Sequence, residues 1–315
     1  MTASSHGAEP WRPRVLVVGA GAIGGYLACL LARAGCPVTV LVRPGSAPWG
    51  STVAIVDGPD AGAAEVAVTD TPTDPADLVV FAVKSYDTAS AATLARAAVT
   101  DATTVLELQN GVDRAAAVDA VLGSGSTLAG TIFLECVREA PGVVRYLSGA
   151  RRVHLGEADG GGVSDRARAV ADVLRAAGLD AHAHDDVRPE LWRKFVLVCA
   201  ANSLTALTGE PFGSILSHPA GRSVVGGIIA EACAVGRASG VDLPSDLEEQ
   251  SLDLLLRLGP QLRSSMLRDV RAGRQTEVDA LNGHVLALAH RLGVAVPRNE
   301  LVTLALGVRT GRENP

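Results

Sequence analysis

Long apolar runs are missing from this sequence. No stretch of about 18 apolar residues passes without a charged one, and a helix that crosses a bilayer needs roughly 20 apolar residues. The first residues, MTASSHGAEPWRPR, also lack the apolar segment of a secretion signal. We therefore expect a cytoplasmic protein with no membrane partner.

Excess positive charge and paired cysteines are missing too. The chain has 28 lysine and arginine residues against 34 aspartate and glutamate residues, so it lacks the broad positive field that nucleic-acid binding requires. No Cys-x-x-Cys pair occurs among the five cysteines, and their odd number suits neither a disulfide framework nor a zinc site. We expect reduced core cysteines, no bound metal and no nucleic-acid partner. The cysteines are Cys29, Cys36, Cys136, Cys199 and Cys233.

Apolar residues are plentiful, at 48% of the chain, and its 315 residues exceed the usual size of a single hydrophobic core. Short apolar runs at 15–18, 38–42, 78–83 and 104–108 predict buried strands. Helical patterns lie between and after them, near 22–34, 88–98 and 113–121. A β-rich stretch over 127–155 with a turn at Pro141-Gly142, a helix over 164–177 and a strand over 180–183 follow.

The alternation of strands and helices predicts a doubly wound parallel sheet of the Rossmann type. After Pro189 every pattern is helical, with helices expected at 190–207, 219–239, 245–257 and 277–291. The predicted fold class is therefore α/β, with an N-terminal Rossmann-type domain and an all-α C-terminal domain. We expect a flexible lead-in over 1–13, the Rossmann domain over 14–186 and the helical domain over 187–315.

A glycine-rich turn follows the first predicted strand and opens a helix. Gly19-Ala20-Gly21-Ala22-Ile23-Gly24 fits the G-x-G-x-x-G pattern of dinucleotide-binding turns. Gly19 permits the tight turn, Gly21 lets a pyrophosphate approach the backbone, and Gly24 lets helix and strand pack closely. The N–H groups of the first helical turn, at Ala22 and Ile23, favour an anion. The alternative is a turn that only connects strand to helix.

Arg43 ends the second predicted strand, where NAD-binding versions of this turn place a carboxylate that binds the ribose 2′-hydroxyl. A guanidinium can instead pair with a 2′-phosphate through two hydrogen bonds. The expected cofactor is therefore NADP(H). The alternative is that Arg43 is only a solvent-exposed loop residue without a ligand. Lys84 and Asn110 end later strands and are candidates to contact the cofactor, although a solvated lysine and an Asn-Gly turn are ordinary there.

The predicted helix from residue 190 carries two polar residues on one face. Lys194, Val198 and Asn202 are spaced four apart, so they share a stripe of the helix. Lys194 could also extend along the helix start with its ammonium in solvent, and Asn202 could bond a backbone carbonyl. Farther on, Ser264 or Thr276 could be helix caps. Glu277 could be an acidic residue in the first turn of a helix, where the helix dipole favours negative charge.

Taken together, these residues resemble the ketopantoate reductase (2-dehydropantoate 2-reductase) family over about residues 14–299. The resemblance is carried by Gly19 to Gly24, Arg43, Lys84, Asn110-Gly111, Glu190-Leu191-Trp192-Arg193-Lys194, Asn202 to Ala206, Ser264-Ser265-Met266-Leu267, Thr276 to Asp279 and Asn282-Gly283. It implies hydride transfer from NADPH to the 2-oxo carbon of ketopantoate, in a cleft between the two domains. The small 2-oxo acid is then the partner, and the oligomeric state stays open, a homodimer included.

The resemblance also implies roles for individual residues. Lys194 would be the general acid that protonates the forming alkoxide. Glu277 would hold the substrate hydroxyl and Ser265 its carboxylate. Asn110 would position the nicotinamide and the lysine, and Asn202 would line the substrate site.

Two positions depart from the family pattern. Val198 stands where the family often has an asparagine, and a polar pocket residue is replaced around Phe212. A hydrogen-bond partner for the 4-hydroxyl of ketopantoate is then missing. We therefore expect a 2-oxo acid or ketone without that hydroxyl to be reduced at least comparably well.

Three other functions stay open. The first is a relative that reduces a less polar 2-oxo acid, ketone or imine in secondary or catabolic metabolism. The second is a non-catalytic dinucleotide-sensing protein, against which Lys194 and Glu277 argue. The third is a member of the 3-hydroxyisobutyrate and 6-phosphogluconate dehydrogenase group, which resembles the chain less closely.

Overall fold

The computed structural model describes residues 11–46, 49–123, 125 and 127–311, and the chain divides into two compact units. Unit 1 contains the chain up to Val83 together with Asp87–Gln109 and Asp113–Val187. Unit 2 contains Arg188 onward and two short segments, Lys84–Tyr86 and Asn110–Val112. The first ten residues of the lead-in expected over 1–13 lie outside the described part.

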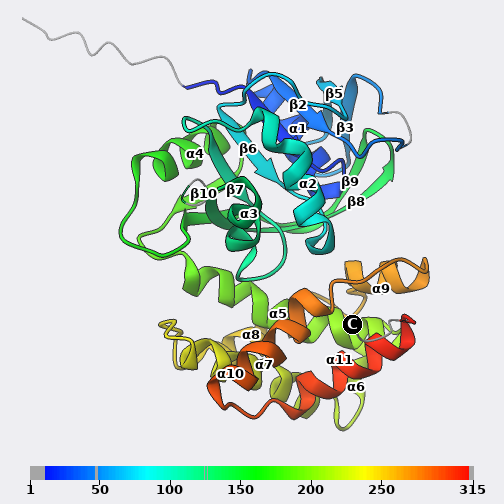
Figure 1. Ribbon diagram of the computed structural model, residues 1–315. Helices are drawn as coiled ribbons and strands as arrows, with labels where there is room; N and C mark the ends of the chain where they lie inside the picture. Colours follow the sequence, from blue (N-terminus) through cyan, green and yellow to red (C-terminus); the bar gives the residue numbers. More distant parts are fainter. Residues whose placement is uncertain (1–10, 47–48, 124, 126, 312–315) are drawn as a thin grey trace, which may run out of the picture. The chain divides into compact units, whose positions relative to one another are not determined.

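Unit 1 is built on one sheet, which has ten strands in the described residues (Figure 1). Their order is β4-β3-β9-β8-β7-β6-β1-β2-β5, and β10 pairs with β9. The bounds are β1 Val15–Val18, β2 Val38–Leu41, β3 Thr52–Val56, β4 Gly62–Glu65, β5 Ala67–Thr69, β6 Leu78–Phe81, β7 Thr104–Glu107, β8 Thr127–Ala140, β9 Val143–Glu157 and β10 Asp180–Ala183. Most neighbours run parallel, and β8 and β9 form an antiparallel hairpin whose turn contains Gly142 at φ +74°.

The central strands are buried on both faces because helices cover both. Val17 of β1 and Val80 of β6 belong to one hydrophobic cluster, whereas Val18 and Phe81 belong to a second cluster. Since successive side chains of a strand point to opposite faces, the two clusters lie on opposite sides of the sheet. The predicted doubly wound sheet is thereby confirmed.

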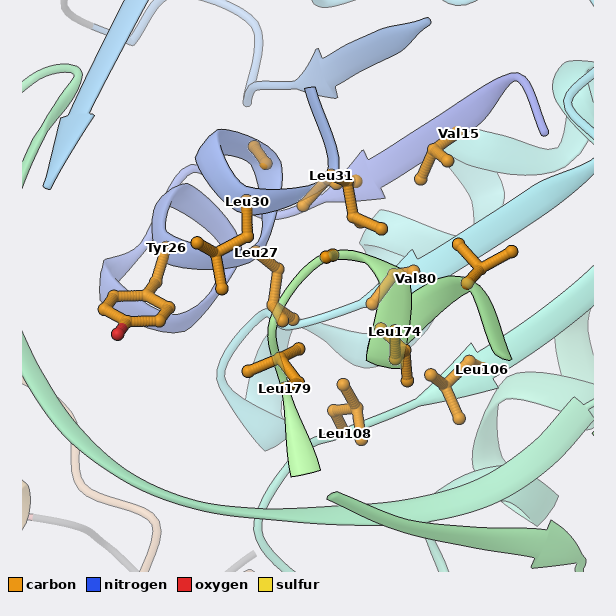
Figure 2. Packing of buried hydrophobic residues seen from close by; sticks show 14 of the residues in the cluster. Val15, Tyr26, Leu27, Leu30, Leu31, Val80, Leu106, Leu108, Leu174 and Leu179 are labelled. Atoms are coloured by element: carbon orange, nitrogen blue, oxygen red, sulfur yellow. The ribbon is translucent and has the colours of Figure 1, made fainter. Parts of the chain in front are cut away.

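Helix α1 (Ala22–Arg33) supplies much of the first cluster (Figure 2). Leu27 and Leu31 are fully buried and pack with Val80 and Leu106 of the sheet. Leu174 of α4 (Asp165–Ala176) belongs to the same cluster. Helices α2 (Thr88–Ala95) and α3 (Arg114–Leu122) contribute to the second cluster. Burial of this apolar area holds the start of α1, and with it the glycine turn, against β1.

Unit 2 is helical from Arg188 on, as expected (Figure 1). The long helix α5 packs against α7, α8, α9 and α11. The bounds are α5 Arg188–Thr208, α6 Phe212–Ser217, α7 Gly221–Ala238, α8 Leu247–Arg257, α9 Ser265–Arg271, α10 His284–Leu292 and α11 Pro297–Arg309. No described helix is long and apolar enough to span a bilayer.

The structure also departs from the expected elements. Strands β3, β4 and β5 were not predicted, because they are three to five residues long and partly exposed. The helix expected over 277–291 begins instead as a π-helical turn, η3 (Asp279–Gly283), which continues into α10. Glu277 precedes this turn, so it is not a first-turn acid of a helix. All five cysteines are free and buried.

Replacing Gly24 by alanine will destabilise unit 1. A Cβ at Gly24 would lie 1.9 Å from the carbonyl oxygen of Gly19, so the backbone itself would have to shift. Overpacking of this kind costs about 1–3 kcal/mol. Urea unfolding measures the loss. Gly21→Ala is the matched control, since its nearest contact would be the Ala82 carbonyl oxygen at 3.9 Å, and equal stability of the two variants would contradict the argument.

Candidate active site

The glycine turn of unit 1 leaves one side of its backbone open. Gly19 has φ +116°, which favours glycine, and Gly24 lies directly against Gly19. Gly21 is the N-cap of α1, and a Cβ there would still stand clear of its surroundings. The first turn of α1, which starts at Ala22 and Ile23, carries no acidic side chain. The arrangement fits a pyrophosphate that approaches the backbone at Gly21 and meets the positive end of the helix.

Arg43 lies two residues after β2 and has a carboxylate partner that the sequence did not reveal. Its Nη2 lies 2.7 Å from Oδ2 of Asp87, and its side chain is 71% exposed. A guanidinium has five N–H donors, so this ion pair leaves donors for a ligand. Asp87 precedes α2 and was not a candidate, because nothing in the local pattern links it to a residue 44 positions earlier.

In unit 2, the buried carboxylate of Glu277 accepts hydrogen bonds from three donors. Oε2 accepts hydrogen bonds from Lys84 Nζ at 3.0 Å and from Asn110 Nδ2 at 3.3 Å. Oε1 accepts a hydrogen bond from the backbone N–H of Ser85 at 3.1 Å. The Glu277 side chain is only 5% exposed, and an ionised carboxylate is stable in such a place only with partners of this kind. The structure thus unites three predicted site residues, Lys84, Asn110 and Glu277.

Lys84 has a second carboxylate partner, Asp269 of α9. Lys84 Nζ lies 3.0 Å from Asp269 Oδ2, and Asp269 Oδ1 accepts hydrogen bonds from Arg274. Burial opposes the charge on Lys84, but Glu277 and Asp269 outweigh it and raise the pKa of Lys84 above its ordinary value. Lys84 is therefore charged at neutral pH. Asp269 and Arg274 were not among the predicted residues.

Helix α9 is linked to α5 through its N-cap residue, Ser264. The Oγ of Ser264 accepts a hydrogen bond from the Leu267 N–H at 3.0 Å and lies 2.7 Å from the Thr205 Oγ1 of α5. Ser264 is thus a helix cap, as considered from the sequence. Ser265, the predicted carboxylate-binding residue, follows it as the first residue of α9 and is half-buried.

The predicted residues of α5 lie on one face, as their spacing requires. Lys194, Val198 and Asn202 are each half-buried, and most residues between them are buried. The backbone carbonyl of Asn202 lies 3.4 Å from Ser264 Oγ, so Asn202 is next to the start of α9. Phe212, at the start of α6, is fully buried and contributes to packing.

Asn282 fixes the segment that follows Glu277. Its Nδ2 donates to the Cys199 carbonyl of α5 at 3.2 Å and to Asn299 Oδ1 of α11 at 2.9 Å. Asn282 is fully buried within η3. Three elements are therefore held together one turn beyond Glu277, which restricts where its backbone can lie.

A simple signal for this site is present in the composition. Lys84 and Lys194 are the only two lysines in the sequence, against 26 arginines. An ammonium is a compact charge with three donors, whereas a guanidinium is a planar fork. The two positions that carry lysine are therefore candidates for a role that arginine cannot fill, and both are predicted site residues.

Comparison with known proteins agrees with these features. Residues 15–160 match the family described as "Ketopantoate reductase PanE/ApbA", and residues 186–309 match "Ketopantoate reductase PanE/ApbA C terminal". The chain is 32% identical over 295 residues to the 2-dehydropantoate 2-reductase of Halobacterium salinarum, covering 90% of this chain and 94% of the relative.

Solved structures extend the comparison to the fold. The crystal structure of a PanE/ApbA family ketopantoate reductase from Ralstonia eutropha matches with a TM-score of 0.84 and 30% identity, covering 94% of this chain and 98% of that one. D-mandelate dehydrogenase, solved with NADH and anilino(oxo)acetate, has a TM-score of 0.83 at 20% identity, with 94% and 98% covered, and is similar in fold. With family matches along most of its length and a relative of this similarity, the chain is an oxidoreductase that belongs to the ketopantoate reductase PanE/ApbA family.

Proposed function

We propose that the protein reduces the keto group of a 2-oxo acid with NADPH, and that the substrate is 2-dehydropantoate (ketopantoate), which becomes pantoate. The observation that carries the proposal is the buried Glu277 carboxylate with its three donors. Such a group is costly to bury and serves well as a fixed acceptor for a substrate hydroxyl. Membership of the family supplies the reaction class.

Unit 1 holds the cofactor in this proposal. Gly21 and the first turn of α1 bind the pyrophosphate, and the free donors of Arg43 bind the 2′-phosphate. NADPH, when bound, supplies the hydride for the carbonyl carbon. Nothing else in the reaction requires a further cofactor.

Lys194 donates the proton. Hydride addition to the carbonyl carbon leaves negative charge on the oxygen, and an ammonium beside that oxygen stabilises the charge and then protonates it. Carbon gains the hydride and oxygen gains the proton, so the ketone becomes a secondary alcohol. Lys194 is half-buried on α5, where the surrounding apolar side chains strengthen its electrostatic effect.

The other substrate contacts come from the same unit. Glu277 accepts the substrate hydroxyl, Ser265 binds the carboxylate and Asn202 lines the site. Asn110 orients Glu277 through its amide and positions the nicotinamide and the lysine. Val198 offers an isopropyl group on the same face of α5 as Lys194. That apolar group favours a second candidate substrate, a 2-oxo acid or ketone without a hydroxyl.

Removing the ammonium of Lys194 will suppress turnover. We expect wild-type protein to oxidise NADPH in the presence of ketopantoate, and Lys194→Ala to lower kcat by about 100-fold or more, the usual contribution of a positioned acid. A spectrophotometric assay of NADPH consumption, run beside a panel of other 2-oxo acids, measures both. Because cofactor affinity resides in unit 1, the Kd of NADPH should change little. Near-normal turnover in the variant would mean that another group supplies the proton.

Cofactor preference tests Arg43. We expect wild-type protein to bind NADPH more tightly than NADH, and Arg43→Ala to weaken NADPH selectively by about 1.5–3 kcal/mol, the value of a charged hydrogen bond. Titration of both nucleotides by fluorescence gives the four affinities. Equal wild-type affinity for NADH and NADPH would refute the assignment of Arg43. Arg14→Ala, which removes an exposed guanidinium paired with Asp77 in the same unit, is the matched control.

A further inference from the structure

Lys84 and Glu277 each keep hydrogen-bonding capacity that the described residues do not use. An ammonium has three N–H donors, and those of Lys84 bond Asp269 and Glu277, which leaves one. An ionised carboxylate has about four acceptor positions. Lys84, Asn110 and Ser85 take three of them on Glu277, which leaves one on Oε1.

A free donor and a free acceptor on adjoining groups are complementary to a hydroxyl. A hydroxyl accepts one hydrogen bond and donates another, so it can satisfy Lys84 and Glu277 together. A methyl group can satisfy neither, and a keto oxygen only the donor. The Lys84 side chain is 34% exposed, so a ligand can reach it.

We propose that Lys84 and Glu277 together recognise a hydroxyl of the substrate, and that Asp269 is the positioning residue that holds Lys84 for this task. This inference rests on the proposed function and deepens it. It gives Lys84 a place in substrate recognition, where the sequence alone suggested contact with the cofactor. It also assigns a role to Asp269, which neither motif nor resemblance singled out.

Asp269 is suited to this role by its burial and its own partners. Its side chain is 7% exposed, and Arg274 holds its other oxygen through Nε at 3.0 Å and Nη2 at 2.8 Å. Arg274 thus holds the Asp269 carboxylate in place independently of Lys84. Hydrogen bonds to Asp269 and Glu277, each at 3.0 Å, restrict the ammonium at the end of the flexible Lys84 side chain.

This arrangement revises what Val198 suggested. The loss of an amide at residue 198 removes one partner for the hydroxyl, but Lys84 and Glu277 supply a donor and an acceptor from elsewhere in unit 2. Discrimination in favour of a hydroxylated substrate is therefore retained. A site built to bond a hydroxyl rejects an analogue that lacks it, because the polar groups of the site are left unpaired.

The test compares two substrates in full-length protein. The substrates are ketopantoate and its deoxy analogue, which has a methyl group in place of the hydroxymethyl group. We expect the wild type to prefer ketopantoate in kcat/KM, and Asp269→Asn and Lys84→Met each to lower the preference ratio by about tenfold, equivalent to about 1.4 kcal/mol. The change in kcat/KM should lie mainly in KM. The Kd of NADPH should stay within about twofold of the wild-type value, which is much less than the tenfold change expected in the preference ratio.

Controls separate this role from a structural one. Asp253→Asn removes the same charge from an exposed position on α8 and should leave the ratio unchanged. If Asp269→Asn does not fold, Asp269→Glu keeps the charge but displaces it by one methylene, and it should also lower the ratio. Equal losses for both substrates in the variants would overturn the proposal by showing a structural role.

Three further outcomes can be told apart. A Lys84→Met variant with weakened NADPH binding and an unchanged substrate ratio would overturn the proposal and return Lys84 to the cofactor. Failure of the wild type to reduce any 2-oxo acid would refute the proposed function itself, and the inference with it. Reduction of 2-oxo acids with no preference for ketopantoate would overturn the inference alone.

Discussion

The burial of two carboxylates, those of Glu277 and Asp269, is the constraint on which the candidate active site depends. Each is less than a tenth exposed, and a buried ionised carboxylate must have cations or N–H donors around it. Unit 2 obtains them mainly from two short segments, residues 84–86 and 110–112, that lie within the sequence of the sheet-bearing unit. The helical unit is therefore incomplete without pieces of chain from far upstream.

The choice of lysine at residue 84 follows from the same constraint. An ammonium can bond two carboxylates and still present a third N–H, because its donors point in different directions from one atom. A guanidinium spreads its donors over a plane and would have to displace one of the carboxylates. Other ion pairs of the described residues use exposed arginines, as at Arg43 with Asp87 and Arg14 with Asp77, where pairing with one carboxylate is sufficient.

Local signals were enough to predict much of the fold and part of the site. The buried strands at 15–18 and 78–81 appear as apolar runs, and the glycine turn is recognisable because all its requirements lie within six residues. No local pattern predicts strand β3, because the strand is stabilised by pairing with β9, nearly 90 residues later. Asp269 could not be predicted as a site residue for the same reason, since its partner Lys84 is 185 residues away. The π-helical turn before α10 is likewise set by the tertiary contacts of Asn282.

The distance along the chain between Lys84 and Glu277 also has a consequence for biosynthesis. The two residues are 193 positions apart, and a ribosome adds about 5–20 residues per second. Lys84 and Asn110 therefore emerge, and the strands before them can pair, well before their carboxylate exists. A nascent or truncated chain can form most of the sheet, yet it carries an unneutralised lysine where the finished protein has an ion pair. The polar cluster therefore cannot be completed until synthesis has passed Glu277.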